Sequence, residues 1–203
     1  MSARDKANAP RLVLAVSLAI ATAACSESGS DVERGDGLAA QHYEGPRPEG
    51  VSTPDEPVTT TYYVPQQAIG DMYEIEAGEI AMKRATSPEV RAFAQQMVED
   101  HNATLAQLRN FVADNPINRA LAQNLDPRRR AMIENLRSAS DDDFEHVYLG
   151  QQAAAHDEAY NLNKSFAANG GYPELQAIAA ENAERIDQHR QKIENLLSKA
   201  ANP

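Results

Sequence analysis

The clearest structural signal in the chain is the segment SPEVRAFAQQMVEDHNATLAQLRNFVADN, residues 87–115. Ser87 is a good helix N-cap, Pro88 suits the first helical position, and Glu89 places negative charge where the helix dipole favours it. Residues at steps of three or four then form one stripe, which consists of Val90, Phe93, Ala94, Met97, His101, Leu105, Leu108 and Val112. The segment predicts a long amphipathic helix with His101 on its core-facing side.

A second helical pattern precedes this segment, over residues 66–85. Its predicted stripe consists of Ile69, Met72, Ile75, Glu79 and Met82. The break at residues 86–88 leaves only a minimal turn, and such a short connection makes the two helices antiparallel neighbours. The run from Thr59 to Val64 is expected to be a short extended piece that packs on the domain edge.

Three further helical patterns follow residue 115. A short helix over residues 127–138 is expected to lie across one end of the long helices. Residues 142–169 predict the third long helix, which Gly170 and Gly171 end. Pro173 opens the fourth, whose stripe consists of Leu175, Ile178, Asn182, Ile186, His189, Ile193 and Leu196.

Composition agrees with a helical fold. The chain of 203 residues is 42% hydrophobic but only 5% aromatic and has no Trp, which favours alanine- and leucine-rich helix packing over a β-sandwich. We therefore predict an all-α fold, an antiparallel four-helix bundle with a short extra helix between helices two and three. The predicted bundle spans residues 66–200, which is enough to bury a core without metal or disulfide support.

The first 25 residues have the layout of a bacterial export signal. A positively charged beginning precedes a short apolar run, residues 12–20, which is too short to cross a bilayer. The small residues that follow end in Thr22-Ala23-Ala24-Cys25, which resembles a lipobox with Thr22 in place of the usual Leu. We predict a lipoprotein signal peptide over residues 1–24 and lipidation of Cys25, with an ordinary small-residue cleavage site as the alternative.

Residues 25–65 differ abruptly in composition from the segments on either side. Gly, Ser, Pro, Asp and Glu dominate and no helical period is present, which predicts a disordered acidic linker. A linker of this length reaches roughly 35 Å. If the lipobox resemblance holds, Ser26 after Cys25 implies the outer membrane. The domain is therefore expected on the periplasmic side of the cell envelope, with its lipid anchor in the membrane.

Charge and cysteine content exclude several classes of function. The formal net charge is -11, and loss of residues 1–24 removes three positive charges and one negative charge, which leaves about -13. Nucleic acid is not an expected partner, because phosphate contacts need Lys and Arg. The only cysteine is Cys25, so no intramolecular disulfide forms. No Gly-rich loop opens a helix and no Ser has a plausible base beside it, so no catalytic residue is predicted.

Three segments carry a family resemblance. They are Met97 to His101, the spaced set Phe144, Tyr148, Leu149, Gln152 and His156, and the fourth long helix with His189. These segments resemble the bacterial family called domain of unknown function 4142, over roughly residues 66–200. The resemblance implies an exported protein with a ferritin-like fold, of a kind often labelled predicted outer membrane protein. It implies no particular activity.

The residues of a ferritin-type di-iron site are absent from the sequence. That site needs a Glu from each of two helices and a Glu-x-x-His from each of the other two. No glutamate stands three residues before His101, His156 or His189. A looser metal site is still an alternative, because Glu79 and these three histidines come from or near the apolar stripes of four different helices. Such a site would hold iron, copper or zinc.

The rise per residue of a helix orders these four candidates along the helices. Measured from the end where residues 87 and 170 turn, His101 and His156 lie level at roughly 20 Å, whereas Glu79 lies at roughly 12 Å. His189 is expected about one helical turn above the level pair. We therefore favour hydrogen-bonded core histidines, with a metal or small-ligand site and a pH-sensing network as alternatives. The expected hydrogen-bond partners are Gln152 and Asn182.

Taken together, these features predict a non-enzymatic, envelope-anchored lipoprotein that acts as a periplasmic binding or interaction module without a cofactor. Its expected partner is another envelope protein. The alternative is a divergent ferritin-like protein that binds iron, copper or zinc and carries out oxygen or peroxide chemistry.

The lipid anchor is tested by fractionation of cells that express a Cys25→Ser variant. We expect this variant to leave the membrane fraction, because the thiol that carries the lipid is gone. The native chain serves as the control and is expected with the membranes. A Cys25→Ser protein that still sediments with membranes contradicts the anchor.

Overall fold

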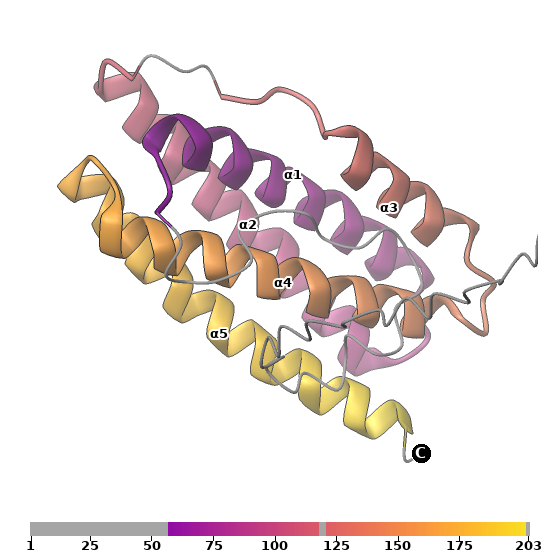
Figure 1. Cartoon of the computed structure of the whole chain (residues 1–203). Helices are drawn as coiled ribbons and strands as arrows, with labels where there is room; N and C mark the ends of the chain where they lie inside the picture. Colours follow the sequence, from indigo (N-terminus) through magenta and orange to yellow (C-terminus); the bar gives the residue numbers. More distant parts are fainter. Residues whose placement is uncertain (1–56, 118–120, 202–203) are drawn as a thin grey trace, which may run out of the picture. The chain divides into compact units, whose positions relative to one another are not determined.

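A computed structural model describes residues 57–117 and 121–201. This part of the chain is all-α, as predicted, and its helices are α1 (Thr60–Arg84), α2 (Pro88–Asp114), α3 (Pro127–Ser138), α4 (Phe144–Asn169) and α5 (Pro173–Ala201) (Figure 1). None of these helices is both long and apolar enough to cross a bilayer. The predicted signal peptide and the lipidation site at Cys25 lie outside the described residues.

Local capping signals place most helix starts where the sequence predicts them. The Ser87 side chain accepts a hydrogen bond from the backbone N–H of Val90 at 3.3 Å, and Pro88 is the first residue of α2. The Asp126 side chain accepts one from the N–H of Arg129 at 2.7 Å at the start of α3. The predicted starts of α2, α3 and α5 are confirmed to the residue or within one.

The start of α1 differs from the prediction. Thr59 caps this helix by accepting a hydrogen bond from the N–H of Tyr62, so the expected extended piece is instead the first helical turn. Pro65 lies within the helix and removes one backbone hydrogen bond. Tyr63 and Val64 are fully buried, and the burial of their apolar surface offsets that loss.

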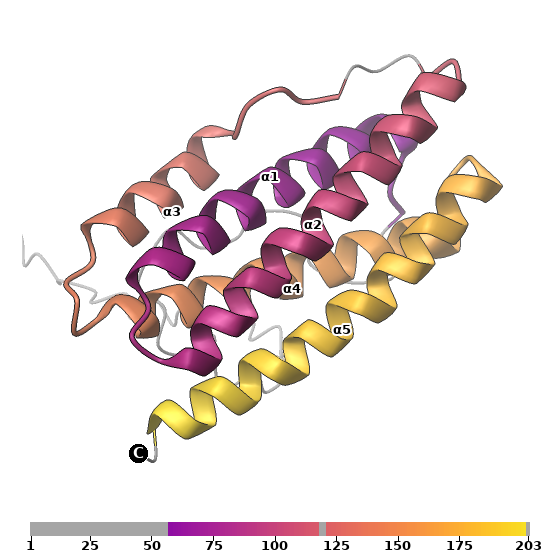
Figure 2. The same ribbon diagram turned by 180° about the vertical axis from the view of Figure 1, so that it is seen from behind.

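The four long helices pack as two antiparallel pairs, α1 with α2 and α4 with α5, and the pairs meet through α1–α4 and α2–α5 contacts (Figures 1 and 2). The short helix α3 lies alongside α1 and α4 and not across an end, so its predicted position is wrong. Its Met132, Ile133 and Leu136 pack into the core, which explains this position. Arg84 also donates to the carbonyl oxygens of Leu136 at 3.0 Å and Ala139 at 2.7 Å.

Two apolar clusters fill the core, one toward each end of the long helices. One contains Tyr73, Phe93, Met97, Tyr148 and Ile193, among others. The other contains Tyr63, Leu105, Leu108, Phe166 and Leu175, among others. On each long helix, buried polar residues gather around the place where the stretches of the two clusters meet. We call this set the polar layer: Gln67, Asp71, Glu74, His101, Thr104, Gln152, His156, Asn182 and His189.

The core-facing side of α1 is also not the predicted one. Met82 is 40% exposed, and Met72 and Ile75 are only half-buried. The buried side carries alanines, one glycine and three polar residues, and it includes Gln67, Ala68, Asp71, Glu74, Ala77, Gly78 and Ala81. A search for an apolar stripe misses this side because polar residues interrupt it.

Two glycines of α1 give a matched test of this packing. A Cβ atom at Gly78 would lie 2.9 Å from the Ala94 carbonyl oxygen and 2.8 Å from Val98 Cγ2, whereas a Cβ atom at Gly70 meets nothing within 4 Å. We expect Gly78→Ala to destabilise the protein by about 1–3 kcal/mol because α2 must shift. Gly70→Ala is expected to stabilise it by up to about 1 kcal/mol, because Ala favours the helix.

Urea unfolding of both variants measures the two effects, and each variant is the control for the other. Equal changes in the free energy of unfolding would contradict the close α1–α2 approach at Gly78.

Candidate metal centre

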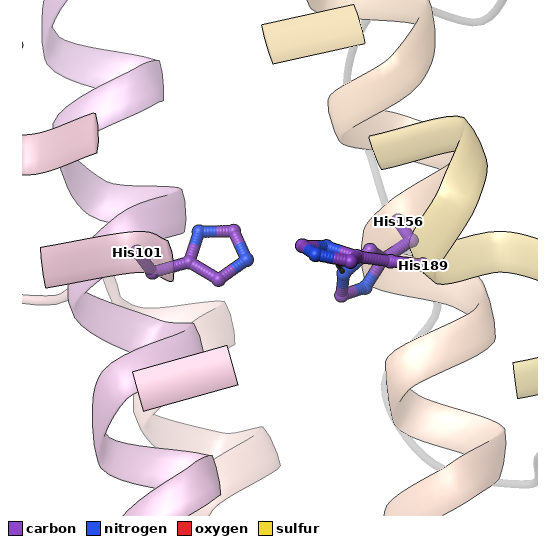
Figure 3. A group of neighbouring side chains, drawn as sticks. All are labelled: His101, His156 and His189. Carbon is purple, nitrogen blue, oxygen red and sulfur yellow. Dashed lines mark hydrogen bonds between the residues drawn. The ribbon is translucent and has the colours of Figure 1, made fainter. Parts of the chain in front are cut away.

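Three histidines from three helices meet in the polar layer. They are His101 on α2, His156 on α4 and His189 on α5, and all three are buried. One ring nitrogen of each lies within 4.8 Å of those of the other two. The His101 ring points from one side toward the rings of His156 and His189, which lie close together on the other side (Figure 3). We call this group the histidine cluster.

In each ring, one nitrogen faces the other two histidines and the other faces away from them; we call these the inner and the outer nitrogen. Each outer nitrogen lies within hydrogen-bond distance of an oxygen atom. His101 Nδ1 lies 2.9 Å from Asp71 Oδ1, and His189 Nε2 lies 2.9 Å from Asp100 Oδ2. His156 Nδ1 lies 2.9 Å from the backbone carbonyl oxygen of its own helix at Gln152. Carboxylate and carbonyl oxygens only accept hydrogen bonds, so each outer nitrogen carries the proton.

The inner nitrogens of the neutral rings therefore present lone pairs. His156 Nε2 and His189 Nδ1 lie 3.3 Å apart, and with both outer nitrogens protonated no proton remains for a hydrogen bond between them. His101 Nε2 is buried and has no hydrogen-bond partner among the described residues. Three ring nitrogens with lone pairs thus lie within 4.8 Å of one another, an arrangement that a cation stabilises and that is otherwise unfavourable.

Electrostatics favour neutral rings at two of the three positions. Burial, aided by the charge of His101, lowers the pKa of His189 to about 4. The same two causes, with the charge of His189, lower the pKa of His156 well below its usual value. Burial also opposes a charge on His101, but the hydrogen bond and negative charge of Asp71 outweigh it and raise the pKa. A proton that enters the cluster therefore resides on His101.

The spacing of these nitrogens suits a metal ion. Imidazole nitrogens bind zinc at 2.0–2.1 Å, so two ligands of one tetrahedral or trigonal ion lie about 3.3–3.6 Å apart. The pair of His156 and His189 is already at 3.3 Å. Outer carboxylates that fix the orientation of metal-binding imidazoles are typical of metal sites, and Asp71 and Asp100 occupy such positions here.

The structure brings together three of the four candidate ligands. His189 lies beside His101 and His156 and not one turn above them. The predicted heights placed the turns at residues 87 and 170 at the same end of the bundle, but they lie at opposite ends: Ser87 N–H donates to Glu145 at the start of α4, whereas Tyr172, after α4, packs against Phe111 near the end of α2. Glu79 is not part of this group, because it is exposed and lines a surface groove with Lys83 and Arg109. The physical reason is the rotation of α1, which turns Asp71 and Glu74 toward the core instead.

The acidic partners of the cluster, Asp71 and Glu74, are not among the residues predicted from the sequence. Asp71 and Glu74 lie on the side of α1 that contains Ala68, Ala77 and Ala81, and a search for small residues at helical spacing would have found that side. Of the expected partners, Gln152 contributes its backbone oxygen to His156. Its side chain donates to Glu74 Oε2 at 2.6 Å.

The comparisons with known proteins assign the chain to a family. The fold and the site place the described part of the chain in the class of all-α domains with a buried cluster of three histidines. The family model described as Domain of unknown function (DUF4142) matches residues 46–196, so the chain belongs to this family. This confirms the family resemblance seen in the sequence. Neither the curated proteins nor the solved structures contain a match.

Glu74 gives a pH test of the polar layer. Burial raises its pKa from 4.5 to about 7, although the charge of His101 and the hydrogen bond from Gln152 oppose this. The folded state thus holds a proton that the unfolded state has lost, so the stability that Glu74 contributes is full below pH 4.5 and is lost as the pH rises through about 7. Glu74→Gln removes this dependence.

We expect the free energy of unfolding of Glu74→Gln minus that of the wild type to be about 2 kcal/mol larger near pH 8 than near pH 5, because only the wild type loses stability over this range. Urea unfolding with a chelator present measures it. The exposed Glu79 on the same helix supplies the control variant Glu79→Gln. An equal difference in the control would contradict burial as the cause.

Proposed function

We propose that this protein binds a transition-metal ion, zinc or copper, through His101, His156 and His189. The observation that carries the proposal concerns three buried imidazole rings. One nitrogen of each ring lies within 4.8 Å of those of the other two, and the outer nitrogen of each ring is hydrogen-bonded to an oxygen atom. We favour zinc and copper over iron because all three proposed protein ligands are imidazoles, whereas the usual non-haem iron site includes a carboxylate. The binding module expected from the sequence would then have a metal ion as its ligand.

The energetics of the cluster favour this function over a purely structural role. A buried polar atom without a partner costs about 1–3 kcal/mol, and His101 Nε2 is such an atom. A structural histidine pair would also place a proton between His156 and His189, which their outer partners oppose. A bound cation satisfies all three inner nitrogens at once.

The proposal includes the setting of the site. The two antiparallel helix pairs support a ferritin-like four-helix bundle that has exchanged the Glu-x-x-His set for three histidines. The lipobox-like sequence before Cys25 supports a lipid anchor, with the domain in the periplasmic space of the envelope. In this setting the protein would take up or hold metal ions outside the cytoplasm.

Elemental analysis of the purified chain tests metal binding. The mature chain with Cys25→Ser is suitable because it lacks both the anchor and the only thiol. After purification without chelators and addition of zinc or copper, we expect one equivalent of metal per chain. The double variant His101→Ala His156→Ala is expected to lose it, because one imidazole remains.

His146 supplies the matched control, since it is an exposed histidine on α4. His146→Ala is expected to keep one equivalent. Circular dichroism shows whether each variant is still helical. Less than one equivalent in the unaltered site, or full occupancy in the helical double variant, would overturn the metal site in favour of hydrogen-bonded core histidines.

A further inference from the structure

Two of the three histidines of the cluster, His101 and His189, come from α2 and α5, and we call the line along which these two helices meet the α2–α5 seam. Of the neighbouring long helices, α2 and α5 are packed least closely. In Figure 2 they lie side by side on one face, and no other described helix covers the line between them. An opening between α2 and α5 therefore breaks less packing than an opening between any other two neighbouring long helices.

Closer packing shuts the other sides of the cluster. At Gly78, α1 and α2 approach so closely that a Cβ atom would lie 2.9 Å from the Ala94 carbonyl oxygen. The short helix α3 lies alongside α1 and α4, and there Arg129 Nη2 lies 3.2 Å from Glu158 Oε1. Helices α4 and α5 are packed along most of their length. The α2–α5 seam is thus the side on which the cluster is least enclosed.

A small cavity at this seam reaches the cluster. Its volume is about 10 Å³, and both His101 and His189 line it. Its lining also includes Asp100 and Arg185, which are partly exposed to solvent. A space of this size holds about one water molecule. The cavity therefore joins side chains at the surface to two of the three proposed metal ligands, and a small separation of the two helices would let an ion pass.

Among the three oxygen partners of the histidine rings, only that of Asp100 belongs to a side chain that reaches solvent. The Asp100 side chain is 30% exposed, whereas Asp71 and Gln152 are fully buried. Asp100 Oδ2 accepts a hydrogen bond from Gln96 Nε2 at 3.1 Å and lies 2.9 Å from His189 Nε2, and no described residue donates to Oδ1. A carboxylate oxygen is thus available to a cation at the outer side of the seam.

Arg185 places a positive charge at the same cavity. Its Nη1 atom lies 3.5 Å from Asn182 Oδ1, and it forms no ion pair with a described residue. A divalent ion that approaches Asp100 is therefore attracted by one side chain of the cavity wall and repelled by another.

We propose that metal ions reach the histidine cluster through the α2–α5 seam, where the Asp100 carboxylate attracts the ion and the Arg185 guanidinium repels it. The proposal rests on the proposed metal site. Along this route the ion exchanges bound water molecules for imidazole nitrogens without a change of oxidation state. Asp100 is a positioning residue, because it guides the ion and holds the His189 ring but is not a ligand of the bound ion.

Stopped-flow absorbance with copper(II) at low ionic strength tests the route, with the mature Cys25→Ser chain as the parent. The double variant His101→Ala His156→Ala gives the signal of copper bound elsewhere, which is subtracted. We expect Asp100→Asn to lower the association rate constant about tenfold, and Arg185→Gln to raise it by a similar factor, because each removes one charge beside the route. Asp100→Asn keeps a carbonyl oxygen for His189 Nε2, so both variants are expected to hold one equivalent of copper.

Two matched controls make the same charge changes away from the seam. Glu79→Gln and Arg109→Gln alter exposed residues of the surface groove that α1, α2 and α3 form. Each control is expected to change the association rate constant less than about twofold, because solvent and salt screen charges at the surface.

Copper content is measured first and separates the two proposals. A parent chain without copper overturns both the metal site and the route. A parent chain with one equivalent, whose association rate constant is unchanged in both seam variants or changes equally in the controls, overturns the route alone. Loss of copper from a helical Asp100→Asn variant also overturns it, because Asp100 would then be needed to hold the ion. If Asp100→Asn does not fold, Arg185→Gln decides, and an unchanged rate constant in that variant overturns the route.

Discussion

The centre of this protein depends on one buried carboxylate, that of Asp71. Its Oδ1 atom accepts hydrogen bonds from Gln67 at 3.1 Å and Thr104 at 2.8 Å, and it lies 2.9 Å from His101 Nδ1. A carboxylate that is fully removed from water is costly unless such donors surround it. Because Gln67 lies on α1 and the other two on α2, a slip of one helix past the other would break the set.

The polar layer and the apolar clusters perform different tasks. The clusters on either side supply most of the buried apolar surface, but their alanine, leucine and phenylalanine contacts would tolerate a shift of one helical turn more readily. The Gln152 side chain on α4 donates a hydrogen bond to Glu74 on α1 at 2.6 Å, and such a bond forms only when the two helices are aligned in one particular register. The clusters also keep water away from the histidines, which strengthens every electrostatic interaction among them.

The sequence predicts this architecture better than it predicts the centre. Caps, Gly and Pro breaks and helical spacing are local signals, and they suffice for the all-α fold, for most helix bounds other than the start of α1, and for the presence of His101, His156 and His189 on buried faces. Which side of α1 meets the core depends on the other helices, so Glu79 was chosen where Asp71 belongs. The level of His189 depends on the direction in which α4 and α5 run relative to α1 and α2, because the turns at residues 87 and 170 lie at opposite ends of the bundle, and local sequence signals do not supply that direction.

Charge balance explains why a metal ion suits this layer better than a proton. The centre carries the carboxylates of Asp71 and Asp100 beside three imidazoles. One proton on His101 compensates Asp71 but leaves the inner nitrogens of His156 and His189 opposed at 3.3 Å. A divalent ion in place of that proton brings two positive charges for two carboxylates and a bond for each inner nitrogen. The hydrogen bonds that fix the rings then act as outer contacts of a metal site, already in position before the ion arrives.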